Sequence, residues 1–429
     1  MRPVLIRGGL VVDPSQRLDA RLELLLAEGR VGAVGERLDA PADAQVVDAQ
    51  GLVVCPGLID VHVHLREPGG EHKETIRSGA AAAAAGGFSA VVAMPNTSPP
   101  IDNPAAVGFV RAEGLRAGGA RVYPSGTITV GQKGEQLTEF GELIEAGAVC
   151  VTDDGRPVSH AGIMRLALQY ALAFDLPVAV HEEELSLSAG GSMNEGQIAT
   201  RLGLLGIPNA AEDVMIARDL MLAELTGARL HVQHVSTRGG VELIRAARAR
   251  GVQVSAEATP HHFTLTDAAV EGYTTNAKMN PPLRTEADRA AVREALRDGT
   301  LDVIATDHAP HHYDEKEQAF EDAPNGIVGL ETALGLALTE LVHPGLIDLP
   351  TLVARMSCTP ARALALPGGT LAVGAPADVT LFDPQREWTV QPERFLSRSR
   401  NTPFAGRRLR GRAVRTFVGG RSVWAEKSA

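Results

Sequence analysis

The chain has 429 residues, which is long for one ordinary compact domain and suits two domains or one large α/β barrel with an addition. Apolar residues make up 44% of the sequence, enough to bury a large core. The 52 acidic residues outnumber the 41 basic ones, and the net charge of −11 argues against a nucleic-acid-binding surface.

Cysteine usage and hydropathy indicate a cytoplasmic protein. Cys55, Cys150 and Cys358 are widely separated, form no CxxC pair and cannot make a disulfide framework. A reducing compartment fits this pattern best. The N-terminus lacks the positive region and long apolar run of a signal peptide. No stretch approaches the ~20 apolar residues that a membrane helix requires, so no membrane partner is expected.

The two ends of the chain share a β-rich texture. The first segments, "VLIRGGLVVDP", "RLELLLAEGRVGAVG" and "AQVVDAQGLVVCPG", are short apolar runs broken by Gly and Pro. The tail repeats this texture in "GTLAVGAPADVTLFDP" and "VRTFVGGRSVWAEK". The pattern predicts one small β-sandwich domain built from residues 1–54 and 366–429.

The middle of the chain alternates apolar strands with Ala- and Leu-rich helical segments. The predicted strands are "LIDVHVH", "FSAVVAMPN", "RVYPSGT", "AVCVTDD", "LPVAVHEE", "RLHVQHV", "VQVSAEATP" and "LDVIATDH". Helices are expected over residues such as 161–174 and 241–250. Strands that alternate with helices indicate a parallel sheet, and eight of them suit a (β/α)₈ barrel over residues 55–365.

Polar side chains stand at the ends of nearly all these strands. They are His62 and His64, Asn96, Asp153 and Asp154, His181, His234, His261 or His262, and Asp307. Active sites of such barrels lie at the carboxyl ends of the strands. The sequence therefore predicts that these side chains meet on one rim.

The pair His62 and His64 suits two ligands of one metal ion, because residues two apart on a strand face the same side. The alternative is a hydrogen-bonded structural pair, which the further rim histidines disfavour. His231 and His234 are three apart and should face opposite sides, so His234, nearer the rim, is the expected ligand. Strand alternation leaves the choice between Asp153 and Asp154 open.

Four imidazoles and two carboxylates are too many for one tetrahedral site and suit two metal ions. Imidazole-rich coordination favours Zn²⁺ over Mg²⁺ or Ca²⁺. Paired metals activate water and polarise a carbonyl, which predicts hydrolytic attack on an amide-like carbonyl or its reverse. Asp307 is placed to bind metal and to act as the catalytic acid and base.

Further rim residues suit a small-molecule substrate. The guanidinium of Arg66 matches a carboxylate, and Asn96, Asn280 and His311 offer donors and acceptors. The alternatives are a turn residue at Asn96 and a solvated loop residue at His311.

Several motifs resemble the signature stretches of the dihydroorotase family. They are "DVHVHLREPG", "ATDHAPHHYDEK", "PNGIVGLET" and "MNPPLR", and "GTLAVGAPADVTLFDP" resembles the closing β-domain of the amidohydrolase superfamily. The resemblance covers nearly the whole chain and is greatest to the bacterial long-chain type. It implies zinc-dependent, reversible interconversion of N-carbamoyl-L-aspartate and L-dihydroorotate in pyrimidine synthesis.

The resemblance also implies roles for individual residues. His62 and His64 would bind one zinc, His181 and His234 the second, with Asp154 as bridge and Asp307 as both ligand and catalytic residue. The implied substrate contacts are His64, Leu65, Arg66, Asn96, Asn280, His311, Asn325 and Gly326. Asn325 stands where some relatives have Phe, a change that the backbone contact implied there tolerates.

Related cyclic amidohydrolases offer the main alternatives. Many bridge their metals with a carboxylated lysine, but no lysine lies between Lys133 and Lys278, which disfavours a dihydropyrimidinase or hydantoinase. Arg66 disfavours an allantoinase, whose substrate lacks a carboxylate. A non-catalytic scaffold would have lost ligands, and all are present. The resemblance further implies a homodimer and is compatible with association with aspartate transcarbamoylase.

Overall fold

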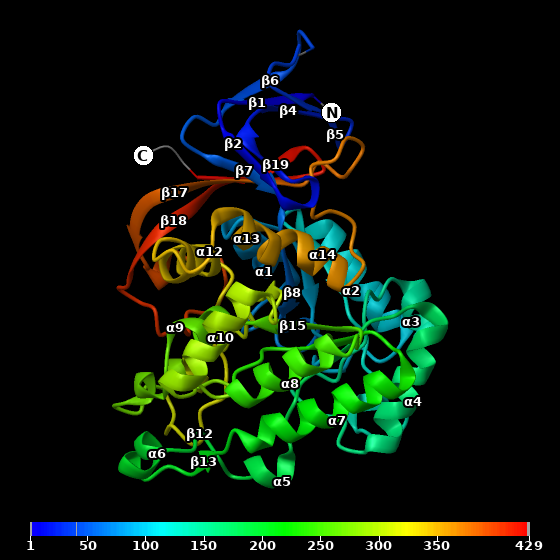
Figure 1. Cartoon of the computed structure of the whole chain (residues 1–429), viewed down its shortest axis with the longest axis vertical. Coiled ribbons are helices and arrows are strands. Elements are labelled where there is room, and N and C mark those ends of the chain that lie inside the picture. The colour runs from blue at the N-terminus through cyan, green and yellow to red at the C-terminus, as the bar shows by residue number, and fades with distance from the viewer. Residues whose placement is uncertain (1, 40, 427–429) are drawn as a thin grey trace.

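Strands from both ends of the chain share one sheet. The computed structural model describes residues 2–39 and 41–426. In the six-stranded sheet of order β19-β18-β17-β7-β2-β3, the late strand β17 pairs antiparallel with the early strand β7. A four-stranded sheet of order β5-β4-β1-β6 lies beside it at the top of Figure 1. The strands of the two sheets are β1 (Val4–Arg7), β2 (Leu10–Asp13), β3 (Leu18–Arg21), β4 (Glu23–Ala27), β5 (Arg30–Gly35), β6 (Gln45–Asp48), β7 (Val53–Pro56), β17 (Val379–Thr389), β18 (Arg408–Val418) and β19 (Arg421–Ala425).

The middle of the chain forms a closed circuit of parallel pairings, here called the parallel ring. Its strands are β8 (Leu58–Val63), β9 (Phe88–Ala93), β10 (Arg121–Pro124), β11 (Val178–Val180), β14 (Leu230–Val232), β15 (Val254–Ala258) and β16 (Val303–Ile304). Parallel ladders join β8 to β9 and β9 to β10, and join β11 through β14 and β15 to β16. Single parallel bridges complete the circuit from Gly126 through Val151 to Val178, and from His308 to Val63.

One predicted strand is reduced to a single bridging residue. The segment "AVCVTDD" contributes only the bridges of Val151, where a regular strand was expected. Its continuation turns early, because the carboxylate of Asp153 accepts hydrogen bonds from the backbone N–H groups of Ile128 (2.8 Å) and Thr129 (3.1 Å). The other seven predicted strands are confirmed, with shorter bounds.

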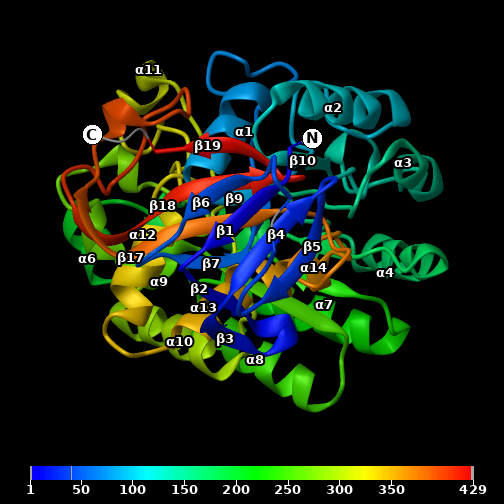
Figure 2. The same ribbon diagram turned by 90° about the horizontal axis from the view of Figure 1, so that it is seen from above.

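Helices connect and cover the strands of the ring, as Figures 1 and 2 show from two directions. The helices are α1 (Ile76–Ala85), α2 (Pro104–Ala117), α3 (Phe140–Ala146), α4 (Ala161–Ala171), α5 (Leu185–Ser188), α6 (Gln197–Leu202), α7 (Ala210–Thr226), α8 (Arg238–Ala249), α9 (Pro260–Thr264), α10 (Glu286–Asp298), α11 (Tyr313–Lys316), α12 (Ala333–Ala337), α13 (Leu349–Val353) and α14 (Thr359–Ala363). Two two-residue strands, β12 (Met193–Asn194) and β13 (Gly206–Ile207), pair outside the ring.

Local sequence explains where the helices begin. Thr75 before α1 and Thr285 before α10 form capping boxes with the residue three positions on, which satisfies backbone N–H groups that the first turn leaves free. Asn103 caps α2 just ahead of Pro104, a residue whose missing N–H costs nothing at that position. At the other end of α2, Gly118 takes the left-handed conformation (φ 74°) that stops the helix.

Small side chains let α1 approach the ring closely. Gly79, Ala80 and Ala82 to Ala84 are buried, and a Cβ on Gly79 would lie 2.3 Å from Leu65 Cδ2. At one end of the ring, Ile59 and Val61 share a buried cluster with Leu364 that follows α14. The ring is thereby filled by apolar side chains at one end, which leaves its other end for polar groups.

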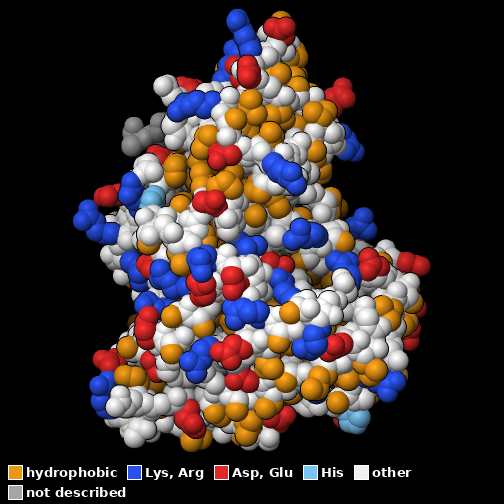
Figure 3. All heavy atoms as spheres, in the orientation of Figure 1, with side chains coloured by type: hydrophobic (Ala, Val, Ile, Leu, Met, Phe, Trp, Pro, Cys, Tyr) orange, Lys and Arg blue, Asp and Glu red, His pale blue; other side chains and the backbone are white. Residues whose placement is uncertain are grey.

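One face of the molecule carries charged side chains of both signs. On the face shown in Figure 3, Lys and Arg side chains are interspersed with Asp and Glu. Among the described residues, no helix combines the length and apolar character needed to cross a membrane.

Candidate metal centre and substrate cavity

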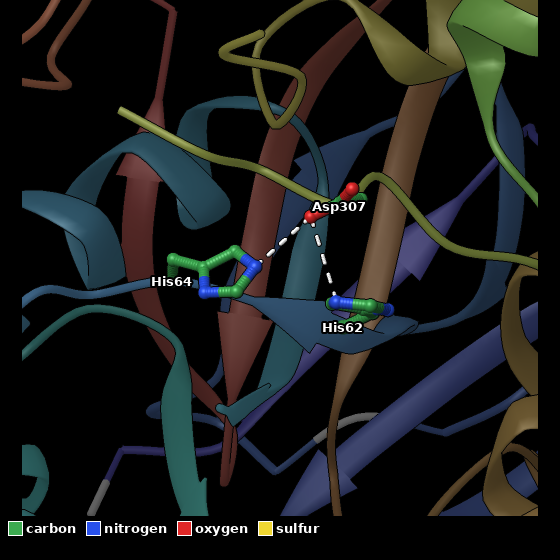
Figure 4. A group of neighbouring side chains, drawn as sticks. All are labelled: His62, His64 and Asp307. Carbon is green, nitrogen blue, oxygen red and sulfur yellow. Dashed lines mark hydrogen bonds and ion pairs between the residues drawn. The ribbon is translucent and has the colours of Figure 1, made fainter. Parts of the chain in front are cut away.

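His62, His64 and Asp307 come together from two neighbouring segments of the ring (Figure 4). His62 lies in β8, His64 follows that strand, and Asp307 follows β16. Asp307 Oδ1 lies 3.0 Å from His64 Nε2 and 3.5 Å from His62 Nε2. These three residues, all buried, form one group with the spacing of a metal-binding site.

Asp154 lies between the two pairs of histidines. Its Oδ1 is 3.3 Å from His62 Nε2, 3.6 Å from His234 Nε2 and 3.7 Å from His181 Nδ1. Its Oδ2 is 3.4 Å from His64 Nε2. Asp154 with His62 and His234 forms a second group with metal-binding spacing. A carboxylate that reaches both histidine pairs is suited to bridge two cations.

The neighbouring carboxylate of Asp153 faces a different part of the chain. It is buried and bound to the backbone and hydroxyl of Thr129 and to the backbone of Ile128. Strand alternation left both Asp153 and Asp154 as candidates for the cluster. The structure places Asp154 in the histidine cluster, whereas Asp153 supports the loop beside it.

Two of the converging side chains depend on unusual backbone conformations. His234 has φ 33° and Asp307 has φ 46°, and each follows the last residue of its strand by two or three positions. Left-handed conformations are uncommon for non-glycine residues, cost about 1–3 kcal/mol and cluster at functional sites. Here they turn a side chain past the strand end toward the cluster. His231 is buried outside the cluster, where its Nε2 lies 3.1 Å from Glu257 Oε2.

Three of the imidazoles have a polar group behind them. His62 Nδ1 lies 2.6 Å from Glu257 Oε1, and His64 Nδ1 lies 2.9 Å from Asn96 Oδ1. His181 Nε2 lies 3.3 Å from Glu183 Oε2. In each case the second ring nitrogen faces the cluster. Metal-binding histidines are commonly held in this way by a carboxylate or carbonyl oxygen.

The carboxylates of the cluster shift the pKa values of its histidines, and the histidines shift those of the carboxylates. Burial lowers the pKa of His181, but Asp154 and Glu183 outweigh it and raise this pKa to about 10. Burial likewise opposes the charge on Asp154, yet His62 and the other histidines hold its pKa well below the usual range. Without another cation, the imidazoles of His62 and His181 would each hold a second proton at neutral pH.

A cavity of about 260 Å³ opens above the cluster. It is lined by His64, Arg66, Asn96, Asp154, Gly155, His181, His234, Met279, Asn280, Asp307, Ala309, His311 and Asn325. Most of the residues proposed for substrate contact are among them. Two are absent. Leu65 packs in the hydrophobic core, and the N–H of Gly326 already donates to the carbonyl of Lys278 (2.9 Å).

Arg66 and His311 lie next to each other on the cavity wall. Arg66 Nε donates to the carbonyl of Pro310 (3.2 Å), and its Nη2 lies 3.4 Å from His311 Nε2. His311 Nε2 lies 2.8 Å from the carbonyl oxygen of Asn325. Burial and then the guanidinium of Arg66 lower the pKa of His311 to about 3, so His311 is neutral. It offers hydrogen bonding, and Arg66 supplies the positive charge.

The sequence pattern missed three supporting residues. Glu257 lies inside a predicted strand. The one feature of the sequence that could have marked it as functional is that it is a lone acidic residue in an apolar strand. Glu183 follows His181 by two positions and also accepts from Asn280 Nδ2 (3.1 Å). Asn401 lies more than 70 residues from its partners, and its Nδ2 donates to the carbonyls of Ala309 and Gly326, both at 2.9 Å. No local pattern marks that residue.

Comparison with solved structures defines the class of protein. The chain resembles the L-hydantoinase (dihydropyrimidinase) of Arthrobacter aurescens with a TM-score of 0.88 and 28% identity, over 100% of this chain and 97% of the other. A dihydropyrimidinase from Brevibacillus agri matches with a TM-score of 0.82 and 24% identity, over 98% and 94% of the two chains. The chain has the α/β fold of the cyclic amidohydrolases.

Sequence comparison then identifies the family. A family model described as dihydro-orotase-like matches residues 51–240. The dihydroorotase of Syntrophotalea carbinolica is 58% identical over 98% of this chain and 99% of its own length, and that of Pelobacter propionicus is 56% identical over the same shares. The chain belongs to the dihydroorotase family.

Proposed function

We propose that the protein is a zinc-dependent dihydroorotase that interconverts N-carbamoyl-L-aspartate and L-dihydroorotate plus water in pyrimidine biosynthesis. The observation that carries this proposal is the convergence of four histidines with Asp154 and Asp307 beneath a cavity that holds Arg66. The close similarity to proteins named dihydroorotase supports the same substrate.

We also propose that the parallel ring with its helices is a (β/α)₈ barrel that spans residues 55–365. Residues 1–54 and 366–429 would form the accompanying β-sandwich domain. The closed circuit of parallel pairings supports the first assignment, and the pairing of β7 with β17 supports the second. Barrels of this kind carry their active sites at the carboxyl ends of the strands, where the histidine cluster lies.

The residues present suit two zinc ions. His62 Nε2 is buried and has no hydrogen-bond partner among the described residues, although it faces the oxygens of Asp154 and Asp307. The donors are imidazole nitrogens and carboxylate oxygens, which zinc prefers. His62 and His64 would hold one ion, His181 and His234 the other, Asp154 both, and Asp307 would complete the set. Bound zinc would activate water and polarise the ring carbonyl.

Asp307 is proposed as the acid and base of the reaction. It lines the cavity, and although burial raises its pKa, the charges of His62 and His64 lower it, so the carboxylate is ionised. During ring opening it would accept the proton of the attacking water. It would then donate that proton to the ring nitrogen as the carbon–nitrogen bond breaks. Ring closure is the reverse of these steps.

Arg66 would select substrates that carry a carboxylate. Its guanidinium lies on the cavity wall next to His311. A planar guanidinium binds a carboxylate through two parallel hydrogen bonds. Hydantoin and allantoin lack that carboxylate, so their binding would leave the half-buried charge of Arg66 without a carboxylate partner from the substrate. This argues for dihydroorotate over the substrates named for the structural relatives.

Replacement of Asp307 by Asn tests the proposed reaction. We expect D307N to lower kcat by about 10²–10⁴-fold in both directions, because it removes the group that moves the proton. Turnover of dihydroorotate and cyclisation of carbamoyl aspartate are measured with metal-replete protein. The matched control is Asp175→Asn, an exposed residue paired with Arg229, which should keep full activity.

The same assay separates the proposal from its alternatives. A wild-type protein that opens hydantoin or allantoin and ignores dihydroorotate would contradict it, as would one that binds no zinc and turns over none of these compounds. The homodimer and the association with aspartate transcarbamoylase stay predictions of the family resemblance.

A further inference from the structure

A buried carboxylate lies directly beneath the histidine cluster and takes no part in the proposed reaction. Glu257 is fully buried in β15. Its Oε1 is 2.6 Å from His62 Nδ1 and accepts a hydrogen bond from the backbone N–H of His234 (3.1 Å). One carboxylate oxygen therefore contacts residues assigned to both metal positions.

The second oxygen of Glu257 is held from the opposite side. Its Oε2 lies 3.1 Å from His231 Nε2, and His231 Nδ1 lies 2.8 Å from the hydroxyl of Ser255. A carboxylate only accepts, so His231 Nε2 must donate and its Nδ1 then accepts from Ser255. This chain of hydrogen bonds fixes the carboxylate deep in the ring, where an unpaired charge would be costly.

The same reasoning sets the tautomer of His62. Since Glu257 accepts at Oε1, the proton of the His62 imidazole lies on Nδ1. In the neutral imidazole, the form that can bind a metal ion, the lone pair then lies on Nε2, a buried atom without a hydrogen-bond partner among the described residues. That atom faces Asp154 Oδ1 at 3.3 Å and Asp307 Oδ1 at 3.5 Å. Three electron-rich atoms this close favour a cation among them.

We propose that Glu257, anchored by His231, is a positioning residue that fixes the ring and tautomer of His62 and so sets the affinity of the centre for zinc. The inference rests on the proposed role of His62 as a metal ligand. It adds a requirement beyond the ligand set and the substrate cavity, because neither Glu257 nor His231 is assigned as a ligand and neither lines the cavity.

Glu257→Gln tests this role, because glutamine keeps the shape and removes the charge. Metal-free protein is titrated with zinc in competition with a chromophoric chelator, without substrate. We expect the zinc affinity of E257Q to fall by about 10–100-fold, the usual effect of losing such a supporting group. The control is Glu331→Gln. Glu331 is a half-buried acid that accepts from the backbone N–H groups of Leu396 and Ser397, and its replacement should leave zinc affinity unchanged.

A pair of variants at His231 gives a test that leaves Glu257 in place. His231→Leu removes the donor to Glu257 Oε2 and should weaken zinc binding. His231→Gln can place an amide N–H near the same point and should bind zinc more nearly as the wild type does. Circular dichroism establishes that each variant is folded. If E257Q fails to fold, the zinc affinities of the two His231 variants test the positioning role instead.

The outcomes separate this inference from the proposed function. If the wild type binds zinc and E257Q binds it with the same affinity, the positioning role is overturned and the proposed reaction is left intact. If E257Q does not fold, the same comparison is made with H231L. A wild-type protein without zinc affinity overturns both. An active enzyme is not needed for either result.

Discussion

At the scale of single residues, the histidine cluster is a place where protons and metal ions compete. In the metal-free protein, burial and the carboxylates of Asp154 and Glu183 together place the pKa of His181 at about 10. Below that pH the imidazole holds a second proton, which must leave before a metal ion binds. Metal binding is therefore coupled to proton release.

This coupling predicts a steep pH dependence of zinc affinity. A raised pKa means that the protonated form dominates below about 10, so the apparent affinity should fall as pH decreases from about 9 to about 6, up to tenfold per pH unit for each proton released. Competition titrations at several pH values measure the slope. Glu183→Gln removes one cause of the raised pKa and should give a shallower slope. A pH-independent affinity in the wild type would contradict the prediction.

Residue patterns in the sequence predicted most of this cluster. Polar side chains at strand ends are visible in one dimension, and the two-residue spacing of His62 and His64 follows directly from strand geometry. His234 and Asp307 were also expected in the cluster. Their left-handed backbone conformations could not be predicted, because the alternation of side chains applies only inside a regular strand. Glu257 escaped notice because its partners, His62 and His231, belong to other strands.

At the scale of elements, the segment before β18 that contains Asn401 forms hydrogen bonds with two loops at the cavity. Asn401 Oδ1 accepts from the backbone N–H of His311 (3.0 Å), and Asn401 Nδ2 donates to carbonyls of Ala309 and Gly326. All of these groups are buried, so each lost hydrogen bond leaves a polar group unsatisfied. The segment therefore fixes how the loop with His311 faces the loop with Asn325.

Asn401→Ala should accordingly affect substrate binding more than metal binding. We expect the KM for dihydroorotate to rise by about tenfold, since two or three hydrogen bonds of about 1 kcal/mol each hold the loops in place. Zinc content should stay at the wild-type level, because Asn401 contacts no proposed ligand. Steady-state kinetics and metal analysis of the same sample provide the comparison, with the exposed Gln385→Ala as control. A variant that loses zinc but keeps its KM would show that the segment acts elsewhere.

Element boundaries were predicted less well than element order. The sequence pattern expected a full strand at "AVCVTDD", and the structure has bridges at Val151 alone, because Asp153 bonds to the loop at Thr129. Hydrophobic runs report burial, and burial continues past the point where ladder pairing stops. The contribution of Asn401 lies beyond any such pattern, since its partners are distant in sequence.

At the scale of the whole molecule, a metal centre that joins several segments of the ring should stabilise the folded state. Residues from β8, from the segments after β11, β14 and β16, and Asp154 meet there. A ligand that binds only the folded protein adds stability in proportion to the logarithm of its concentration, about 4 kcal/mol at 1,000 times its Kd.

Metal removal should therefore lower the melting temperature. We expect a chelator to shift the unfolding transition in calorimetry down by several degrees, and added zinc to restore it. Magnesium serves as the control, because it binds imidazole ligands poorly and should restore nothing. Identical transitions for the chelated and zinc-loaded protein would argue against a metal centre built from these segments.

The shared sheet of the chain ends has a consequence for synthesis. β7 emerges from the ribosome before the parallel ring, whereas its partner β17 follows more than 300 residues later. Until then the nascent polypeptide presents an unpaired strand edge, a feature that promotes aggregation. That edge is covered only after the whole parallel ring has been made, when β17 becomes available to pair with β7.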